Sequence, residues 1–297
     1  CGSPPRSWSA KGGTMRELDV YGIGNPLIDV LVTVSEDELA DFGLQKGTMS
    51  LIDPQRREEL LASLTHKEKR YSCGGSCPNT MIALAACGAA TALAGKIGSD
   101  ELGPIYEDRL SAHGVVSDLK DFDGPTGTSI IMITPDSERT MNTHLGANRH
   151  FTREDVDFSA LERSRMLHFT GYMWDTEEQK AAVEEAIDRA KRHGRTIVFD
   201  VADPFAAERN SDAFRRLIEE HADIAFANSR EAELLLDIAD PEEAVLELGE
   251  LTRTAVVKAG ADGSFVKTRG EPTAHIPAAT AGAVIGANAW SGLAPQF

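Results

Sequence analysis

Short apolar runs alternate with helical segments along most of this 297-residue chain. The runs that have the composition of buried strands are 18–24, 91–98, 166–171, 196–201 and 223–227. Helical patterns at 100–113 and 176–193 follow two of them. Because strand-then-helix units connect parallel strands through helices that cover the sheet, the pattern predicts a doubly wound α/β domain.

Two segments, 26–52 and 126–146, interrupt this rhythm. They carry the alternation typical of strands, as at Leu31, Thr33 and Ser129, but no long helix follows either one. One interpretation is a small separate sheet that acts as a lid over a ligand. The other is an ordinary extension at the edge of the main sheet.

Charge and hydropathy exclude several classes of protein. Lys and Arg number 30 against 47 Asp and Glu, so the net charge is −17. Nucleic acids and anionic membranes both need a basic surface, so neither is an expected partner. No apolar stretch approaches the roughly 18 residues of a membrane span, and no signal peptide is apparent.

Cysteine and histidine usage agrees with a cytoplasmic protein. The four cysteines lack C-x-x-C spacing and the histidines lack H-x-x-x-H spacing, which argues against a zinc site and indicates reduced thiols. Residues 1–14 are polar and rich in Gly, Ser and Pro. We expect them to be a disordered extension, or a remnant of the vector or gene model, ahead of a folded domain at 15–297.

Short polar side chains follow the first predicted strand. The glycines of 22–24 invite a dinucleotide-binding interpretation, but the G-x-G-x-x-G pattern needs a third glycine where Leu27 stands. Asn25 and Asp29 lie instead where α/β folds keep their ligand crevice. A carboxylate there can accept hydrogen bonds from two adjacent hydroxyls of a ribose or sugar. Taken alone, Asp29 could equally be a solvated loop residue.

A glycine pair, Gly74 and Gly75, precedes an alanine-rich run at 79–87 that predicts a helix buried between layers. Paired glycines let backbone N–H groups approach a ligand closely. Ser76 is placed to cap the helix, and Asn79 points from its first turn. The start of an ordinary helix needs a cap but not two glycines, which favours a functional cluster.

These clusters carry a family resemblance. The segment Y-G-I-G-N-P-L-I-D-V (21–30) resembles the opening of adenosine kinases, and G-G-S-C-P-N-T (74–80) resembles a signature of the ribokinase-like (PfkB) family of carbohydrate and nucleoside kinases. The similarity continues through 95–103, 125–129, 138–148 and 228–231, and covers roughly residues 15–268. It implies a three-layer sandwich with a mostly parallel sheet, helices on both faces and a small β lid.

The resemblance also implies roles for individual residues. The substrate hydroxyls and ring would be held by Asn25, Asp29, Gly74, Gly75, Asn79 and Leu145. Arg139 matches an arginine near the transferring phosphate, and its fork of donors suits phosphate oxygens. The alternative for Arg139 is a charge on the lid surface.

On the nucleotide side, Asn228 and Glu231 match an N-x-x-E motif that organises Mg²⁺ and its waters around the ATP phosphates. Because magnesium keeps most of its water, one carboxylate acting through water suffices. Lys258, Gly260 and Gly263 match a K-x-G-x-x-G turn that borders the nucleotide. A simple glycine hairpin is the alternative for that turn.

The end of the chain departs from the family. The family continues with a D-T-T-G-A-G-D-like segment, whose last Asp takes the proton from the attacking hydroxyl. The nearest match here puts Val284 for a glycine and Ile285 for that Asp, so the catalytic base is unknown. Residues 272–297 contain no Asp, Glu, Lys or Arg. A frameshift or gene-model error would explain this, and so would a diverged, inactive relative.

The predicted function is phosphorylation of a hydroxymethyl group with ATP as co-substrate and Mg²⁺ as cofactor. Adenosine is the preferred acceptor, and a furanose sugar is the alternative. A catalytically dead nucleoside-binding protein is a hypothesis from another class. The protein is expected to act as a monomer or a lid-mediated homodimer.

Overall fold

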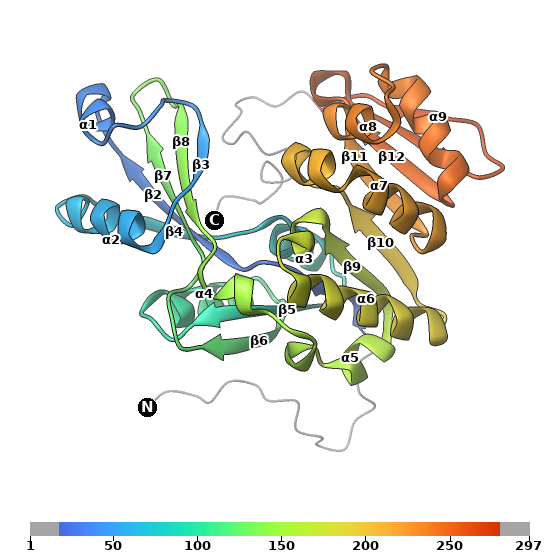
Figure 1. The fold of residues 1–297 in the computed structure, drawn as a ribbon, viewed down its shortest axis with the longest axis horizontal. Coiled ribbons are helices and arrows are strands. Elements are labelled where there is room, and N and C mark those ends of the chain that lie inside the picture. The colour runs from blue at the N-terminus through green and yellow to red at the C-terminus, as the bar shows by residue number, and fades with distance from the viewer. Residues whose placement is uncertain (1–17, 280–297) are drawn as a thin grey trace.

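All five apolar runs predicted as strands lie in one nine-stranded sheet of the computed structural model, which describes residues 18–279 (Figure 1). In spatial order the sheet contains β14 (Ala274–Ile276), β13 (Ser264–Thr268), β12 (Thr254–Lys258), β11 (Ile224–Asn228), β10 (Thr196–Asp200), β9 (Ser164–Thr170), β1 (Leu18–Ile23), β5 (Thr91–Gly98) and β6 (Val116–Phe122). All neighbours from β12 to β6 pair in parallel, and only β13 and β14 add antiparallel edges. The predicted mostly parallel sheet is confirmed.

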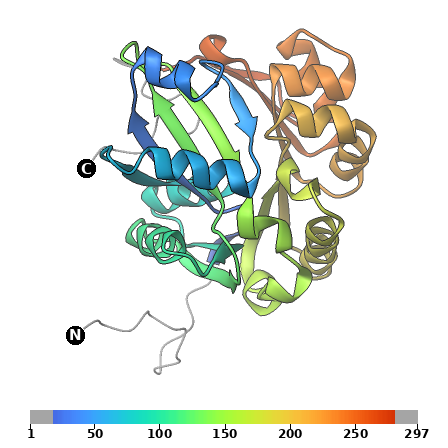
Figure 2. The same cartoon turned by 60° about the vertical axis from the view of Figure 1, so that its left-hand side comes forward.

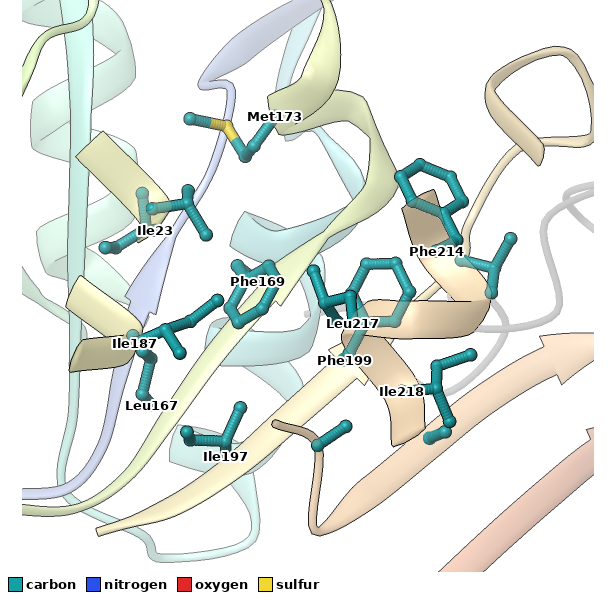
Figure 3. Packing of buried hydrophobic residues seen from close by; sticks show 14 of the residues in the cluster. Ile23, Leu167, Phe169, Met173, Ile187, Ile197, Phe199, Phe214, Leu217 and Ile218 are labelled. Carbon is teal, nitrogen blue, oxygen red and sulfur yellow. The ribbon is translucent and has the colours of Figure 1, made fainter. Parts of the chain in front are cut away.

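Helices cover both faces of this sheet. They are α3 (Ser76–Ala86), α4 (Leu102–Ala112), α5 (Phe158–Glu162), α6 (Glu177–Arg192), α7 (Pro204–Glu220), α8 (Ser229–Leu236) and α9 (Pro241–Leu251). Alternation along β1 divides its side chains between two cores: Tyr21 and Ile23 pack with residues of α6 and α7, whereas Val20 packs with residues of α3 and α4. Phe169, Phe199 and other apolar side chains fill the first core (Figure 3).

The helix at α3 differs from its prediction. Its buried side chains are Cys77, Pro78, Met81 and Ile82, whereas Ala86 at its end is exposed. The helix does contact strands of both sheets, as a helix between layers should, but its C-terminal end is exposed. No helix in residues 18–279 is long and apolar enough to cross a membrane.

A second, five-stranded sheet stands beside the body of the molecule (Figures 1 and 2). In order it contains β3 (Met49–Leu51), β8 (Arg139–His144), β7 (Thr128–Ile133), β2 (Leu27–Thr33) and β4 (Arg70–Gly74). The segments 26–52 and 126–146 thus supply four of its strands, and the separate sheet predicted for the fold is present. The strand β4 was not predicted.

One face of this second sheet packs against two helices. Val30 and Ile130 pack with Leu39 of α1 (Glu36–Asp41) and Leu60 of α2 (Pro54–Ser63). Because strand side chains alternate, Asp29 and its neighbours in register lie on the opposite face. Leu51 on β3 keeps 66% of its surface exposed.

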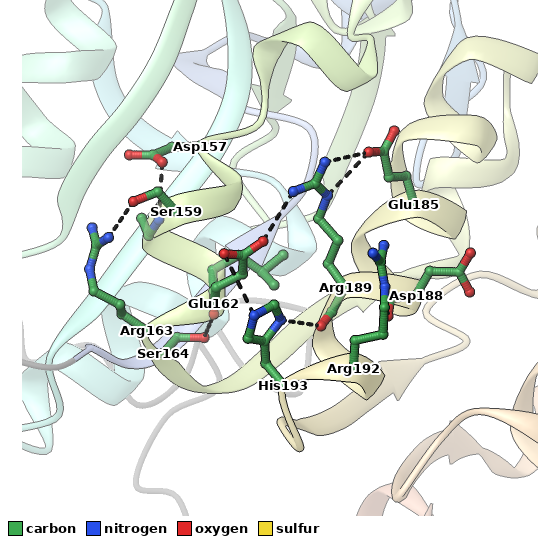
Figure 4. A network of polar contacts seen from close by, with 12 residues as sticks. Asp157, Ser159, Glu162, Arg163, Ser164, Glu185, Asp188, Arg189, Arg192 and His193 are labelled. Carbon is green, nitrogen blue, oxygen red and sulfur yellow. Dashed lines mark hydrogen bonds and ion pairs between the residues drawn. The ribbon is translucent and has the colours of Figure 1, made fainter.

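Ion pairs at the surface join α5 to α6 at the edge of the first core (Figure 4). The Arg189 guanidinium lies 3.0 Å from a carboxylate oxygen of Glu162 and 3.0 Å from one of Glu185, and it stacks 4.2 Å over the Phe158 ring. Partly exposed pairs of this kind contribute up to about 1 kcal/mol each. They support the packing of α6, whose first turn faces the candidate site.

Candidate active site at the junction of the two sheets

The loop after β1 connects the two sheets. The main-sheet strand ends at Ile23, and the chain enters the second sheet at Leu27 without forming a helix. A dinucleotide site needs a helix N-terminus directly after the glycines, so the geometry agrees with the sequence in excluding it. A Cβ on Gly24 would lie 2.5 Å from the Cβ of Cys77, so this turn packs directly on α3.

The glycine pair lies against both polar residues of this loop region. A Cβ on Gly74 would lie 2.3 Å from Oδ1 of Asp29, and one on Gly75 would lie 2.2 Å from the carbonyl oxygen of Asn25. Gly75 also has a φ of +98°, which L side chains rarely adopt. The structure therefore brings together Asn25, Asp29 and the two glycines, as the resemblance implied.

Ser76 does not cap α3, which corrects the sequence prediction. The N-cap position is Gly75, and no side chain accepts a hydrogen bond there. The left-handed backbone at Gly75 shifts the start of the helix, so Ser76 is already its first residue. Asn79 lies half-buried in the first turn, where its backbone N–H donates to the Gly75 carbonyl at 3.0 Å.

Asp29 stands half-buried on the face of the second sheet opposite α1 and α2. Burial raises the pKa of its carboxyl to about 7, and the positive charge of Arg139 opposes that rise. No described side chain donates a hydrogen bond to this carboxylate. Across the sheet, Asp29 is in register with Ser129, whose hydroxyl lies 3.1 Å from that of Thr143. A ligand with hydroxyl groups would find acceptors in this row.

Arg139 and Leu145 bracket the strand β8. Arg139 is the first residue of β8, and its charge is close enough to act on Asp29. Leu145 follows the strand directly and is half-buried before the 3₁₀ turn Gly146–His150. Both residues thus belong to the second sheet and its exit, on the same side of the molecule as Asp29.

The N-x-x-E motif forms a capping box at the start of α8. Asn228 is the N-cap, and its side-chain oxygen accepts from the Glu231 N–H at 2.9 Å. Oε2 of Glu231 accepts from the Asn228 N–H at 2.8 Å, and Oε1 accepts from its Nδ2 at 2.7 Å. The two side chains thus satisfy each other.

Glu231 sits in an acidic, buried position. It is 1% exposed, and burial raises the pKa of its carboxyl to about 7 despite the hydrogen bond from Asn228. The negative charges of Asp200 and Asp203 add to the rise, and the ammonium of Lys258 opposes it. A cation near this carboxylate would relieve that repulsion.

Lys258 is held by an ion pair that the sequence did not reveal. Its ammonium nitrogen lies 3.2 Å from each carboxylate oxygen of Asp200, across the strand that separates them. Gly260 and Gly263 have φ values of +58° and +89° in the connection between β12 and β13. The K-x-G-x-x-G segment is therefore a glycine hairpin in its geometry, the alternative that the sequence left open.

The residues present fit magnesium only as an outer-shell partner. The described part of the chain has no group of three or more His, Cys, Asp or Glu side chains that could hold a metal ion directly. Glu231 keeps lone pairs beyond its bonds to Asn228, so its carboxylate could accept from waters of a bound ion. Val284 and Ile285 lie outside the described residues.

Both sides of the candidate site lie at one edge of the main sheet. Asn25 follows β1, while Asp200, Asn228 and Lys258 end the strands β10, β11 and β12, which run parallel to β1. Carboxyl ends of parallel strands form the ligand crevice in folds of this class. Sequence reasoning missed Asp200 and also Gln179, which donates to Asn25 at 2.9 Å. The T-x-x-Q pattern at 176–179 signals a helix start, but not a contact with the loop after β1.

Comparisons with known proteins agree with this arrangement. A model of pfkB family carbohydrate kinases matches residues 47–288. The guanosine-inosine kinase of Escherichia coli is 25% identical over 232 residues, which are 75% of this chain and only 54% of that enzyme. The adenosine kinase of Saccharomyces cerevisiae is 25% identical over 84% of this chain and 76% of its own length.

Solved structures show the same likeness. The adenosine kinase of Sinorhizobium meliloti superposes with a TM-score of 0.80 at 34% identity, over 91% of this chain and 82% of that one. A protein described as a probable sugar kinase, from Rhizobium etli, superposes with a TM-score of 0.81 at 31% identity over the same shares.

Proposed function

Because the chain belongs to the pfkB family of carbohydrate kinases, we propose that it binds a nucleoside, adenosine by preference, beside ATP, for transfer of a phosphoryl group to a hydroxymethyl oxygen. The observation that carries the proposal is the placement of Asn25, Asp29 and the glycine pair where the two sheets meet. The adenosine kinases and the guanosine-inosine kinase among its relatives support a nucleoside acceptor.

Each of these residues has a task in holding the acceptor. The Asp29 carboxylate accepts hydrogen bonds from two neighbouring hydroxyls of a ribose, and the Asn25 amide adds a donor. A ribose held by these ring hydroxyls keeps its hydroxymethyl group free to react. Gly74 and Gly75 leave room that a side chain would fill, since a Cβ at either position would collide with Asp29 or Asn25.

Arg139 is the residue we assign to the transferred phosphate. An arginine guanidinium offers paired donors in a geometry that suits phosphate oxygens. Its charge already acts on Asp29, so it stands on the acceptor side of the site. Magnesium, when bound with the nucleotide, would neutralise phosphate charge, and Glu231 would order its waters.

Transfer by this chain is expected to be slow. By the family resemblance, Ile285 stands where the family has its catalytic Asp, and an isoleucine cannot accept a proton. Loss of general-base help costs about a hundred- to ten-thousand-fold in rate. A nucleoside-binding protein without turnover is therefore the second candidate, and it uses the same residues to hold adenosine.

A sugar acceptor is the third candidate. Asn25 and Asp29 recognise hydroxyls, which a furanose also presents, and one of the similar structures is described as a probable sugar kinase. We further propose a cytoplasmic location, in agreement with the free thiols of Cys73, Cys77 and Cys87, and a monomer or a dimer formed through the second sheet.

A ligand panel tests the proposal. Thermal unfolding is measured with adenosine, ribose and fructose, and ADP release is measured with each of them plus ATP and Mg²⁺. We expect adenosine to raise the Tm most, with turnover at least about a hundredfold below that of the S. meliloti adenosine kinase assayed alongside. A Tm that none of the three changes would refute the proposal, and a larger shift with ribose or fructose would favour the sugar kinase.

A further inference from the structure

Gln179 is a buried amide that touches the loop holding Asn25. It lies in the first turn of α6 and is 1% exposed. Its Nε2 donates to Oδ1 of Asn25 at 2.9 Å and to the backbone carbonyl of Asn148 at 2.9 Å. Both protons of the amide nitrogen are thus used, one of them on a residue of the candidate site.

The orientation of the Gln179 amide follows from its partners. The Asn148 carbonyl can only accept, so the amide must turn its nitrogen toward that oxygen. The other end agrees, because the Thr176 hydroxyl lies 3.4 Å from Oε1 of Gln179 and can donate to it. Asn148 is itself anchored, since its Nδ2 donates to the Pro26 carbonyl at 2.8 Å.

The orientation of the Gln179 amide fixes that of the Asn25 amide. Because Gln179 presents a donor, Asn25 must turn its Oδ1 toward it, and Nδ2 is then the atom of the Asn25 amide left for a ligand. No hydrogen bond from that Nδ2 to another residue is found within 18–279. We propose that Gln179 is a positioning residue that makes Asn25 a hydrogen-bond donor and thereby selects ligands with a pair of adjacent hydroxyls.

Counting protons explains the selection. Each hydroxyl of a ribose has one proton, and the Asp29 carboxylate can only accept, so that proton goes to Asp29. The same hydroxyl oxygen can then accept from Asn25, provided that Asn25 offers N–H. If the amide were turned around, two acceptors would compete for one proton, and the hydroxyl would keep only its bond to Asp29 while facing an unpaired acceptor. The inference rests on the proposed function, because it assumes that a ribose lies at Asp29.

The test compares two substitutions at Gln179 with three ligands. Calorimetry gives the Kd of adenosine, 2′-deoxyadenosine and 3′-deoxyadenosine for the wild type, Gln179→Leu and Gln179→Glu. In the wild type, removal of the hydroxyl that contacts both Asn25 and Asp29 should weaken binding about tenfold or more. The carboxylate of Gln179→Glu accepts instead of donating and reverses Asn25, so this ratio should fall severalfold, because only the hydrogen bond to Asp29 remains. In Gln179→Leu, which neither donates nor accepts, the ratio should lie between the two.

Two controls and one replacement variant separate positioning from general damage. Glu177→Gln changes an exposed residue two positions before Gln179 in the same helix and should leave the ratio unchanged. The Kd of ATP should be the same in every variant. Should Gln179→Glu fail to fold, Asn25→Asp replaces it, because the new carboxylate still accepts from Gln179 and turns an acceptor toward the ligand, so it should collapse the ratio in the same way.

The outcomes are distinct. A ratio that collapses in Gln179→Glu or Asn25→Asp, with ATP binding retained, supports the positioning role. Equal weakening of all three ligands in these variants overturns it, because a purely structural residue would act on every ligand alike. A wild type that binds adenosine without any penalty for a missing hydroxyl overturns the inference alone. A wild type that binds none of the three overturns the proposed function together with it.

Discussion

The two sides of the candidate site differ in how their polar groups are satisfied. On the substrate side, the Asp29 carboxylate receives no hydrogen bond from a described side chain, and Gln179 leaves the Asn25 nitrogen for a ligand. On the nucleotide side, Asn228 and Glu231 bind each other, and Lys258 is paired with Asp200. Polar groups on the substrate side are thus available to a ligand, whereas those on the nucleotide side are bonded to one another.

This difference separates what can bind from what must first rearrange. A preformed set of acceptors and donors loses little conformational freedom when a ligand arrives. A nucleotide phosphate that recruits Lys258 must break a half-buried ion pair, and a cation that recruits Glu231 meets a carboxylate already bonded twice. We therefore expect the substrate side to act independently and the nucleotide side to depend on its own internal contacts.

The largest effect is expected from Gly75→Ala, which breaks the substrate side. The φ of +98° strains an alanine, and its Cβ would lie 2.2 Å from the Asn25 carbonyl. The free energy of unfolding should fall by about 4 kcal/mol, and adenosine binding should be lost. Gly260→Ala on the nucleotide side is the matched control: its φ is also positive but nothing lies within 4 Å, so a loss of only about 1 kcal/mol is expected. Urea unfolding measures both, and equal losses would contradict the comparison.

The next effect concerns the ion pair on the nucleotide side. Lys258→Met leaves the Asp200 carboxylate, 6% exposed, without its partner, and should cost about 3 kcal/mol of stability. The double variant Asp200→Asn with Lys258→Met should recover most of that loss, and the Kd of adenosine should not change in either. If Lys258→Met kept full stability and lost only ATP binding, Lys258 would be a dedicated nucleotide ligand and the comparison would fail.

Asp29→Ala should act on one ligand only. A hydrogen bond to a charged group contributes roughly 1.5 to 3 kcal/mol, so the Kd of adenosine should rise about ten- to a hundredfold. The Kd of ATP should stay the same, because Asp29 lies on the second sheet and not at the ends of β10 to β12. Calorimetry with each ligand distinguishes these, and an equal rise for both ligands would make Asp29 a structural residue.

The smallest effect is a pH dependence from Asp29. Its folded pKa, about 7, lies above the ordinary value, so the folded protein holds this proton to a higher pH than the unfolded chain does. The resulting stability is present below about pH 4 and is lost as the pH rises through about 7. Asp29→Asn removes the titration, so relative to wild type it should gain about 1 kcal/mol of stability between pH 4 and pH 8, after allowing for solvent screening. A difference that does not vary with pH would show that Asp29 has an ordinary pKa.

Periodicity and glycine placement predicted the layers of this fold well. The strands β1, β5, β9, β10 and β11 follow from apolar runs, and the glycines at 88, 114 and 194, which follow helices, have positive φ. The start of α3 was predicted wrongly. Ser76 was expected to cap the helix with its side chain, but Gly75, with a positive φ, is the N-cap residue. Sequence rules of this kind describe local propensities only. The conformation of Gly75 goes instead with its close packing against the Asn25 carbonyl, a tertiary contact.

The partners within the site were beyond the reach of the sequence. Asn25 and Gln179 are 154 positions apart, and Asp200 and Lys258 are 58 apart, so only the fold brings each pair together. Asn228 and Glu231 show the converse. Their spacing of three residues fits the N-x-x-E motif and also makes a capping box, and the sequence alone does not separate that role from one toward a metal.

The independence of the substrate side is the central claim, and calorimetric titration of the unliganded protein with adenosine, in the absence of ATP and Mg²⁺, tests it most directly. Preformed acceptors at Asp29 and a donor at Asn25 predict binding of adenosine to the protein alone, with a Kd that changes less than about threefold when ATP and Mg²⁺ are added. Adenosine that binds only after the nucleotide, or not at all while ATP binds well, would contradict the account.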